Sequence, residues 1–340
     1  MATAASARAA AQRLESPRLA EIALAGEAVN DSTISRRMAS PLLAPGTFWG
    51  GTYTASTGEQ VTVYFSNRYP QDPSAGQRWA NFLASLIHGS ELSSLTSYLA
   101  PPDEVQRSCG SGALACYSDR QNLLVAPGTD PAVDLSAEAV VTHEYGHHVA
   151  AHRSNDPWPA IAYGPKRWAS YEQVCSRARA KKLFPGAEQS PLYELNPGEG
   201  WAETYRVLNE RKAGLTEPPW DIVDQSLYPD ATVLAAAEQD VTSPWQSGTT
   251  IARTGSVTRA KRVRNYSVST PLDGTLAVTL KTPARARLSL DVFRGSTRIG
   301  HAPGRGTLSI NSEVCGARTL RVRVARLSGA GAFQLTVSKP

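Results

Sequence analysis

The chain has 340 residues and is long enough for two domains. Of these residues 41% are hydrophobic and 19% are charged, a composition typical of a folded globular protein that excludes a disordered or fibrous one. No apolar run approaches the 18 residues needed to cross a bilayer, so we expect no membrane-spanning helix. The formal charge of +5 is unevenly divided, because residues 249–340 hold 16 Lys and Arg against 3 Asp and Glu, a net +13, while the rest carries −8.

The first third of the chain predicts a short leading segment and then a small α/β unit. Residues 1–44 are rich in alanine and have no apolar core of signal-peptide length, so they predict a terminal helix or a flexible segment. Alternating residues on both sides of a polar turn predict a hairpin over residues 47–66. Helical spacing follows over residues 74–88, and His88 at the end of that stretch is expected to face solvent or to cap the helix.

Four cysteines have no spacing typical of a metal site. Cys109 and Cys116 flank a loop with two glycines and are expected to form a disulfide, which leaves Cys175 to pair with Cys315. Four free thiols are the alternative. Two bridges would indicate an oxidising compartment, and hence a secreted or cell-surface protein.

Residues 140–152, VVTHEYGHHVAAH, contain the pattern His-Glu-x-x-His. On an α-helix His143 and His147 project from one face, one turn apart, and can hold one Zn²⁺. Glu144 points beside the metal and is the expected general base. Asp134 or Ser136 is expected to cap the helix, and Gly146 to leave room beside the metal.

Further on, residues 158–183 predict a loop and then a helix that packs through Trp168, Tyr171, Val174 and Cys175, with a basic run expected to face solvent.

A second helix with acidic residues one turn apart is predicted over residues 199–211, after NPG. Glu199 is the expected third zinc ligand, which leaves a fourth position for water. Glu203 is expected to accept a hydrogen bond from the free ring nitrogen of a ligating histidine. The exchange of these two roles, with Glu203 as the ligand, is the alternative.

These two motifs together resemble those of the gluzincin class of zinc metallopeptidases, which carry HExxH on one helix and Glu-x-x-x-Asp on a second. The sequence departs from that class at Glu203, where Asp is usual. The arrangement CG…CYSD…LLV before HEYGHH also resembles bacterial neutral zinc metallopeptidases over residues 45–215. This resemblance implies a zincin-like fold, and it implies that the strand Leu123–Ala126 is an edge strand that pairs with extended substrate.

Other polar residues near the motifs could also contribute to the site, but their patterns indicate a role less strongly. Tyr193 and Tyr205 are candidates to stabilise the oxyanion, although a packing role is the simpler interpretation for both. His148 and His152 lie on the neighbouring helix face, and we assign neither a catalytic role.

The pattern of apolar and polar residues changes near Ser247. A closing helix is predicted around residues 233–237, and from residue 249 short alternating runs predict an antiparallel β-sandwich. The expected fold class is therefore α+β: residues 45–247 form a zincin-like domain with an active-site helix and a small β-sheet, and residues 248–340 form a basic β-sandwich. Its outward arginines indicate a soluble sheet face or an anchor for an anionic surface polymer; nucleic acid is the least favoured partner, because aromatic residues are not interleaved.

The sequence thus predicts a secreted zinc endopeptidase that acts on protein or peptide substrates. The alternatives are a zinc amidase for a cell-wall or other non-peptide amide, and a binding protein that keeps the peptidase scaffold without turnover.

Overall fold

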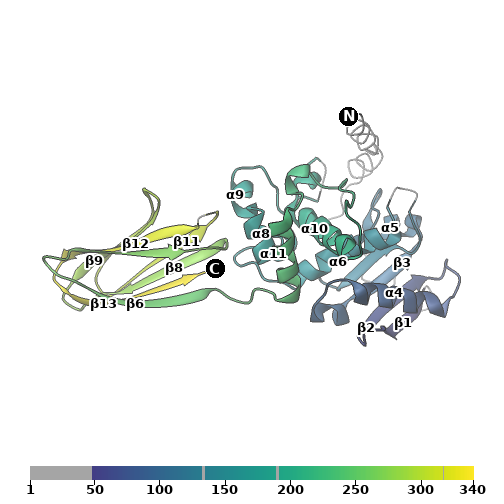
Figure 1. Ribbon diagram of the computed structural model, residues 1–340, viewed down its shortest axis with the longest axis horizontal. Coiled ribbons are helices and arrows are strands. Elements are labelled where there is room, and N and C mark those ends of the chain that lie inside the picture. Colours follow the sequence, from purple (N-terminus) through teal and green to yellow (C-terminus); the bar gives the residue numbers. More distant parts are fainter. Residues whose placement is uncertain (1–47, 132–134, 189–190, 317) are drawn as a thin grey trace, which may run out of the picture.

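The computed structural model describes residues 48–131, 135–188, 191–316 and 318–340 (Figure 1). The segment 1–44, for which a helix or a flexible chain is expected, lies outside these ranges. A mixed α/β part and an all-β part lie end to end, so the molecule is elongated (Figure 1). Within the described residues, no helix is long and apolar enough to cross a membrane.

A five-stranded sheet forms one end of the molecule, with the strand order β1-β2-β3-β5-β4. The predicted hairpin is present, since β1 and β2 pair antiparallel with Thr54 opposite Gln60. β2, β3 and β5 run parallel, and β4 is antiparallel to β5. The strands are β1 (Phe48–Thr54), β2 (Gln60–Ser66), β3 (Thr96–Ala100), β4 (Cys116–Ser118) and β5 (Leu123–Pro127).

The expectation that Leu123–Ala126 is an edge strand is wrong. β5 lies between β3 and β4, and all five of its residues are buried. Leu124 and Ala126 face one hydrophobic core, while Leu123 and Val125 face another on the opposite side of the sheet. A run of apolar residues without polar alternation is typical of such a strand. The edge strands of this sheet are β1 and the three-residue β4.

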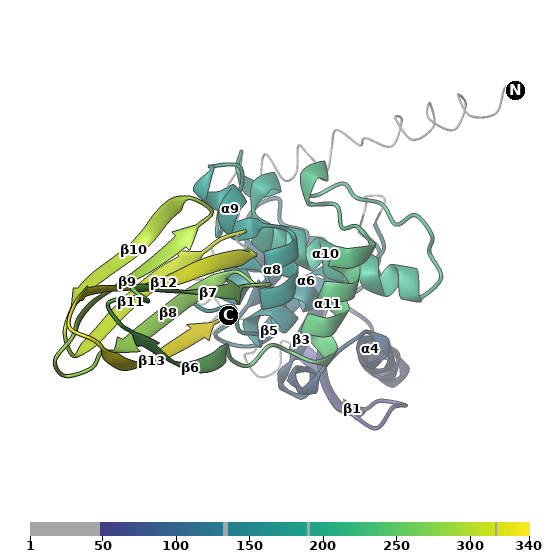
Figure 2. The same ribbon diagram turned by 60° about the vertical axis from the view of Figure 1, so that its left-hand side comes forward.

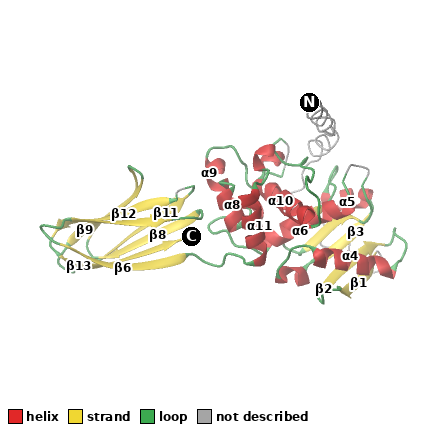
Figure 3. Cartoon of the chain, viewed as in Figure 1, coloured by secondary structure: helices red, strands yellow, loops and turns green. Residues whose placement is uncertain are grey.

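Helices cover both faces of this sheet and continue into a helical layer (Figure 3). α4 begins where the Asp72 carboxylate accepts a hydrogen bond from the Ser74 amide, and it ends at Ser85, three residues before the predicted end. The helices are α4 (Pro73–Ser85), α5 (Pro102–Cys109), α6 (Ala137–Ala151), α7 (Ala160–Tyr163), α8 (Lys166–Tyr171), α9 (Val174–Arg179), α10 (Pro197–Lys212) and α11 (Ala231–Thr242), with 3₁₀ turns η1 (Ser90–Ser94), η2 (Tyr193–Leu195) and η3 (Gln225–Leu227).

The single helix predicted within residues 158–183 is instead divided into α7, α8 and α9. Pro165 precedes α8, and Gln173 has a left-handed backbone with φ of 57°, so each interrupts a continuous helix. Trp168 and Val174 are buried as predicted, but Tyr171 is 47% exposed and does not belong to the packed side.

Two four-stranded antiparallel sheets form the C-terminal part, in the orders β10-β9-β12-β7 and β11-β8-β13-β6 (Figure 2). Their inner faces enclose a separate hydrophobic core, as the predicted β-sandwich requires. The strands are β6 (Thr249–Val257), β7 (Val263–Ser269), β8 (Gly274–Lys281), β9 (Arg287–Arg294), β10 (Thr297–Gly304), β11 (Thr307–Val314), β12 (Thr319–Ser328) and β13 (Gly331–Lys339).

Both expected disulfides are present. Cys109 pairs with Cys116, and Cys175 after the start of α9 pairs with Cys315 after β11. The second bridge joins the helical layer to the sandwich, and an ion pair between Arg179 and Glu313 lies beside it.

Candidate metal centre

The two histidines of the HExxH motif lie on α6, which packs against β4, β5 and α10. Ser136 caps the helix by accepting a hydrogen bond from the Ala139 amide at 3.1 Å, while Asp134, the other predicted cap, lies outside the described residues. His143 and His147 are one turn apart, with ring centroids separated by 5.1 Å. Both therefore project from the same face of the helix, as predicted.

The acidic residues come from α10, which lies beside α6 (Figure 1). Its first turn is fixed by Asn196, whose side chain accepts a hydrogen bond from the Gly198 amide at 3.0 Å. The Trp201 indole donates to the Gly146 carbonyl at 2.7 Å and ties the two helices together.

Gly146, which was expected to leave room beside the metal, lies where α6 meets α10. A Cβ atom on this residue would lie 2.8 Å from the Cα atom of Ala202. The glycine therefore allows the backbones of α6 and α10 to approach each other, and this approach brings their polar side chains together.

His143, His147 and Glu199 form a buried group that could hold a metal ion, with ligand atoms within 4.8 Å of one another. The Glu199 Oε2 atom lies 3.2 Å from His143 Nε2 and 3.3 Å from His147 Nε2. Two ligand atoms about 2.1 Å from a tetrahedral zinc ion would be roughly 3.4 Å apart, so these separations fit such an ion. The donor set of two imidazoles and one carboxylate fits it as well.

Glu203 lies behind the group, where it contacts the far nitrogen of His143. His143 Nδ1 donates to Glu203 Oε2 at 2.9 Å, so a His143 ring that loses one proton can keep this N–H and offer the lone pair of Nε2 to a metal ion. Arg206 donates to both carboxylate oxygens of Glu203, at 3.0 and 2.5 Å. Because these oxygens are already occupied, the geometry favours Glu199 over Glu203 as a ligand.

Arg206 itself was missed in the sequence analysis, although its position three residues after Glu203 is a recognisable helical pair.

Without a metal, protons take the place of the ion between these groups. Burial disfavours a charged His143, but the hydrogen bonds to Glu199 and Glu203 outweigh it and raise its pKa to about 10. Burial opposes ionisation of Glu199 too, yet the two histidines hold its pKa well below the usual range. For Glu203, Arg206 and His143 overcome burial and lower the pKa to about 2. A metal must therefore displace protons from the histidines.

Glu144 follows the first histidine and is 8% exposed. Burial raises the pKa of its carboxyl, and the nearby His147 and His143 offset part of this effect. None of the described residues donates a hydrogen bond to this carboxylate. Its oxygens are thus available to a proton donor at the group.

Of the two candidate tyrosines, only Tyr193 reaches the group. Its hydroxyl donates to Glu199 Oε2 at 2.8 Å from η2, just before α10. The Tyr205 hydroxyl instead donates to the Ile87 carbonyl at 2.6 Å within the core. Tyr205 is therefore a packing residue.

The other histidines of this part of the chain lie outside the group. His148 accepts a hydrogen bond from the Tyr117 hydroxyl and donates to the Glu91 carbonyl, both at 2.9 Å, and burial lowers its pKa to about 4. His152 contacts the His148 carbonyl through Nδ1. His88 contacts the Gly89 carbonyl just after α4.

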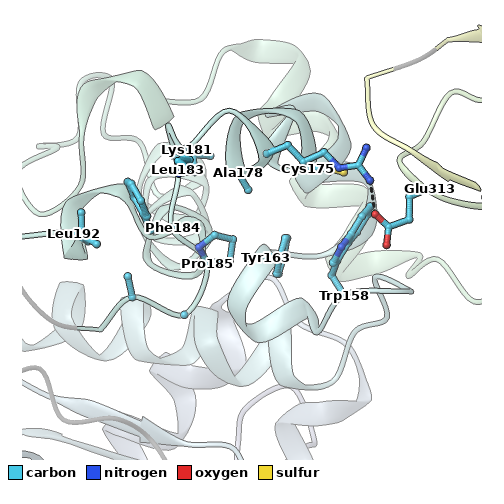
Figure 4. Close-up of a pocket in the computed structure, with 13 residues that line it drawn as sticks. Trp158, Tyr163, Cys175, Ala178, Lys181, Leu183, Phe184, Pro185, Leu192 and Glu313 are labelled. Carbon is cyan, nitrogen blue, oxygen red and sulfur yellow. Dashed lines mark hydrogen bonds and ion pairs between the residues drawn. The ribbon is translucent and has the colours of Figure 1, made fainter. Parts of the chain in front are cut away.

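A pocket of about 570 Å³ lies apart from these residues, between the helical layer and the sandwich (Figure 4). Trp158 and Tyr163 stack in its wall, Phe184 lines the opposite part, and Glu313 contributes from β11. None of the three metal-binding candidates lines it.

No protein-family model matches the sequence, and neither does any curated protein. Among solved structures, the chain is similar to the pre-peptidase C-terminal domain of collagenase from Bacillus anthracis, with 14% identity and a TM-score of 0.23 over 27% of this chain and 89% of that one. It is also similar to the Yersinia pseudotuberculosis-derived mitogen, with 13% identity and a TM-score of 0.23 over 27% and 87% of the two chains. At these TM-scores neither likeness bears on function.

Proposed function

We propose that this chain is a zinc-dependent endopeptidase of the gluzincin type, with His143, His147 and Glu199 as the zinc ligands. The observation that carries the proposal is the convergence of two imidazoles from α6 and one carboxylate from α10 within 4.8 Å, with Glu144 next to the first histidine. Catalytic zinc sites use such a set of three and keep the fourth position for water or substrate. A site that only held an ion would have no use for Glu144.

Each residue has one task in the reaction. When bound, zinc would lower the pKa of a coordinated water to about 7 and polarise the scissile carbonyl. Glu144 accepts the proton of the attacking water and returns it to the leaving amine. Glu203 holds His143 in the tautomer that presents Nε2, and Arg206 fixes Glu203. Tyr193, whose hydroxyl already lies at Glu199, is the candidate donor to the oxyanion.

Secretion or display at the cell surface belongs to the same proposal. The described cysteines are all paired, which is consistent with folding in an oxidising compartment.

Removal and return of the metal test the proposal. The protein is stripped with a chelator, reloaded with one equivalent of zinc, and incubated with a library of peptides blocked at both ends and with cross-linked cell-wall fragments. We expect internal cleavage of the peptides only after reloading, because the metal is needed for the attack of water on the carbonyl.

Three other results would contradict the proposal in different ways. Equal cleavage before and after stripping would exclude a metal-dependent reaction. Cleavage of the cell-wall amide alone would indicate an amidase. No turnover by protein that holds one zinc would indicate a binding protein.

A further inference from the structure

The two outer faces of the β-sandwich differ sharply in charge. In the sheet β11-β8-β13-β6, the residues that alternate with the core are mostly Thr, Ser, Asn and Gln; Lys281 and Glu313 are its charged members, and Glu313 pairs with Arg179. In the sheet β10-β9-β12-β7, the corresponding face carries Arg287, Arg298, Arg321 and Arg323 together with His301. We call this second surface the arginine face.

One carboxylate organises the centre of the arginine face. Asp291 on β9 is 2% exposed, although it points away from the sandwich core. His301 on β10 contacts its Oδ1 atom at 2.6 Å, Arg298 lies at 3.6 Å, and Arg323 on β12 lies at 3.9 Å from Oδ2. One negative charge thus holds two guanidinium groups near each other and leaves an excess of positive charge above it.

The remaining arginines of the face contact no acid. The guanidinium of Arg321 lies 4.2 Å from the ring centre of Phe293, in the row next to Asp291. The ring of Phe293 is therefore covered by a cation. Arg287 is exposed at the start of β9.

No other acidic residue of the described sandwich offsets these charges. Asp273 is 2% exposed and accepts a hydrogen bond from the Gly316 amide. Glu313 lies on the other sheet, in β11, and pairs with Arg179 of α9. With Asp291 these are the 3 acidic residues of segment 249–340, against 16 basic ones. The positive potential of the face is therefore not neutralised from within the domain.

We propose that the arginine face binds a linear polysaccharide that carries carboxylate or sulfate groups. Guanidinium groups form paired hydrogen bonds with such anions, and neighbouring strands about 4.8 Å apart space them in rows along an extended chain. Its aromatic ring is covered by Arg321, so the stacking platform that single-stranded nucleic acids use is missing from the described face.

Binding of the full chain to heparin, alginate and neutral dextran tests this proposal. The variant R298S/R321S/R323S removes three charges from the face, and the matched control R253S/K281S/R305S removes three exposed charges elsewhere in the sandwich. We expect salt-sensitive binding to heparin and alginate but not to dextran. The face variant should bind about tenfold more weakly or worse, since three surface ion pairs are lost together, while the control stays within about twofold.

R298S and R323S remove neighbours of the buried Asp291 and could unfold the sandwich. A second pair of variants therefore tests the proposal without touching these contacts. R287S/R321S spares every Asp291 contact, and R253S/K281S is its control; the same order of affinities is expected. Equal losses in face and control variants would show attraction by overall charge alone. Absence of binding to both polyanions, or binding only to single-stranded DNA or to anionic lipid vesicles, would overturn the proposal.

Discussion

At the scale of single residues, the candidate metal centre depends on which acidic side chain turns an oxygen toward both histidines. Glu199 turns one oxygen toward both histidines, whereas Arg206 occupies both oxygens of Glu203. The spacing of HExxH and of the later glutamates predicted that His143, His147 and Glu199 come together, and they form one buried group. It favoured Glu199 as the ligand but left the exchange with Glu203 open, because both lie on the same helix face one turn apart. Nor could it separate Tyr193 from Tyr205, whose positions depend on how η2 and the core fold around α10.

Substitution of each glutamate by glutamine distinguishes their roles. We expect Glu199→Gln to weaken zinc binding by more than about 100-fold, because a charged ligand is lost. Glu203→Gln should weaken it by about 10- to 100-fold, the range for partners of ligating histidines. It should also destabilise the metal-free fold by about 3 kcal/mol, since the buried Arg206 loses its main partner.

Competition for zinc with a chromophoric chelator and thermal unfolding measure these effects. If Glu203→Gln lost more zinc affinity than Glu199→Gln, the ligand would be Glu203 and our assignment would be reversed.

At the scale of elements, the two helices that carry the motifs were predictable, since each has a cap, a motif and a buried face within one local stretch. The position of β5 was not, because whether a strand lies at an edge depends on which strands pair with it, and here the short β4 covers the side that β3 leaves open. The break of residues 158–183 into α7, α8 and α9 also escaped prediction, because the left-handed backbone of Gln173 has no signal in the residue type. The close approach of α6 and α10 at Gly146 likewise depends on tertiary packing.

Gly146→Ala tests that approach. The substitution gains up to about 1 kcal/mol of helix propensity, but its Cβ meets the backbone of Ala202 at 2.8 Å, where no side chain can turn aside. Because the obstacle is backbone, we expect the upper end of the usual overpacking cost of about 1–3 kcal/mol, and hence a net loss of about 2 kcal/mol in the free energy of unfolding, with weaker zinc binding.

Gly200→Ala is the matched control on α10. Its Cβ would meet the end of the Leu227 side chain at 2.9 Å, which can move aside. Thermal unfolding of both variants decides the matter, and a Gly146→Ala protein as stable as the wild type would show that the helices need no such contact.

At the scale of the whole molecule, the mixed α/β part has a hydrophobic core on each side of its sheet and the sandwich has a third, and a disulfide and surface contacts link the two parts. The Arg318 guanidinium donates to the Ser170 carbonyl at 3.1 Å, next to the Cys175–Cys315 bridge. The sequence predicted this bridge by pairing the cysteines left over, and it predicted the alternating strands of the sandwich. The arginine face could not be predicted from the sequence, because β9, β10 and β12 become neighbours only in the folded sheet.

Removal of each disulfide should have unequal effects. Cys175 and Cys315 are 140 residues apart in the sequence, whereas Cys109 and Cys116 are 7 apart. The chain-entropy relation then gives about 5 kcal/mol for the first bridge and about 2 kcal/mol for the second. We expect C175S/C315S to unfold at a lower denaturant concentration than C109S/C116S, and the reverse order would contradict this view of the link.

The most direct test of the metallopeptidase account is Glu144→Gln, measured for bound zinc and for peptide hydrolysis on the same sample. The variant keeps the size of the side chain and leaves His143, His147 and Glu199 untouched, so we expect one zinc per chain, as in the wild type. Hydrolysis should fall by about 100-fold or more, because the general base is lost. Wild-type hydrolysis by the zinc-loaded variant would contradict the account.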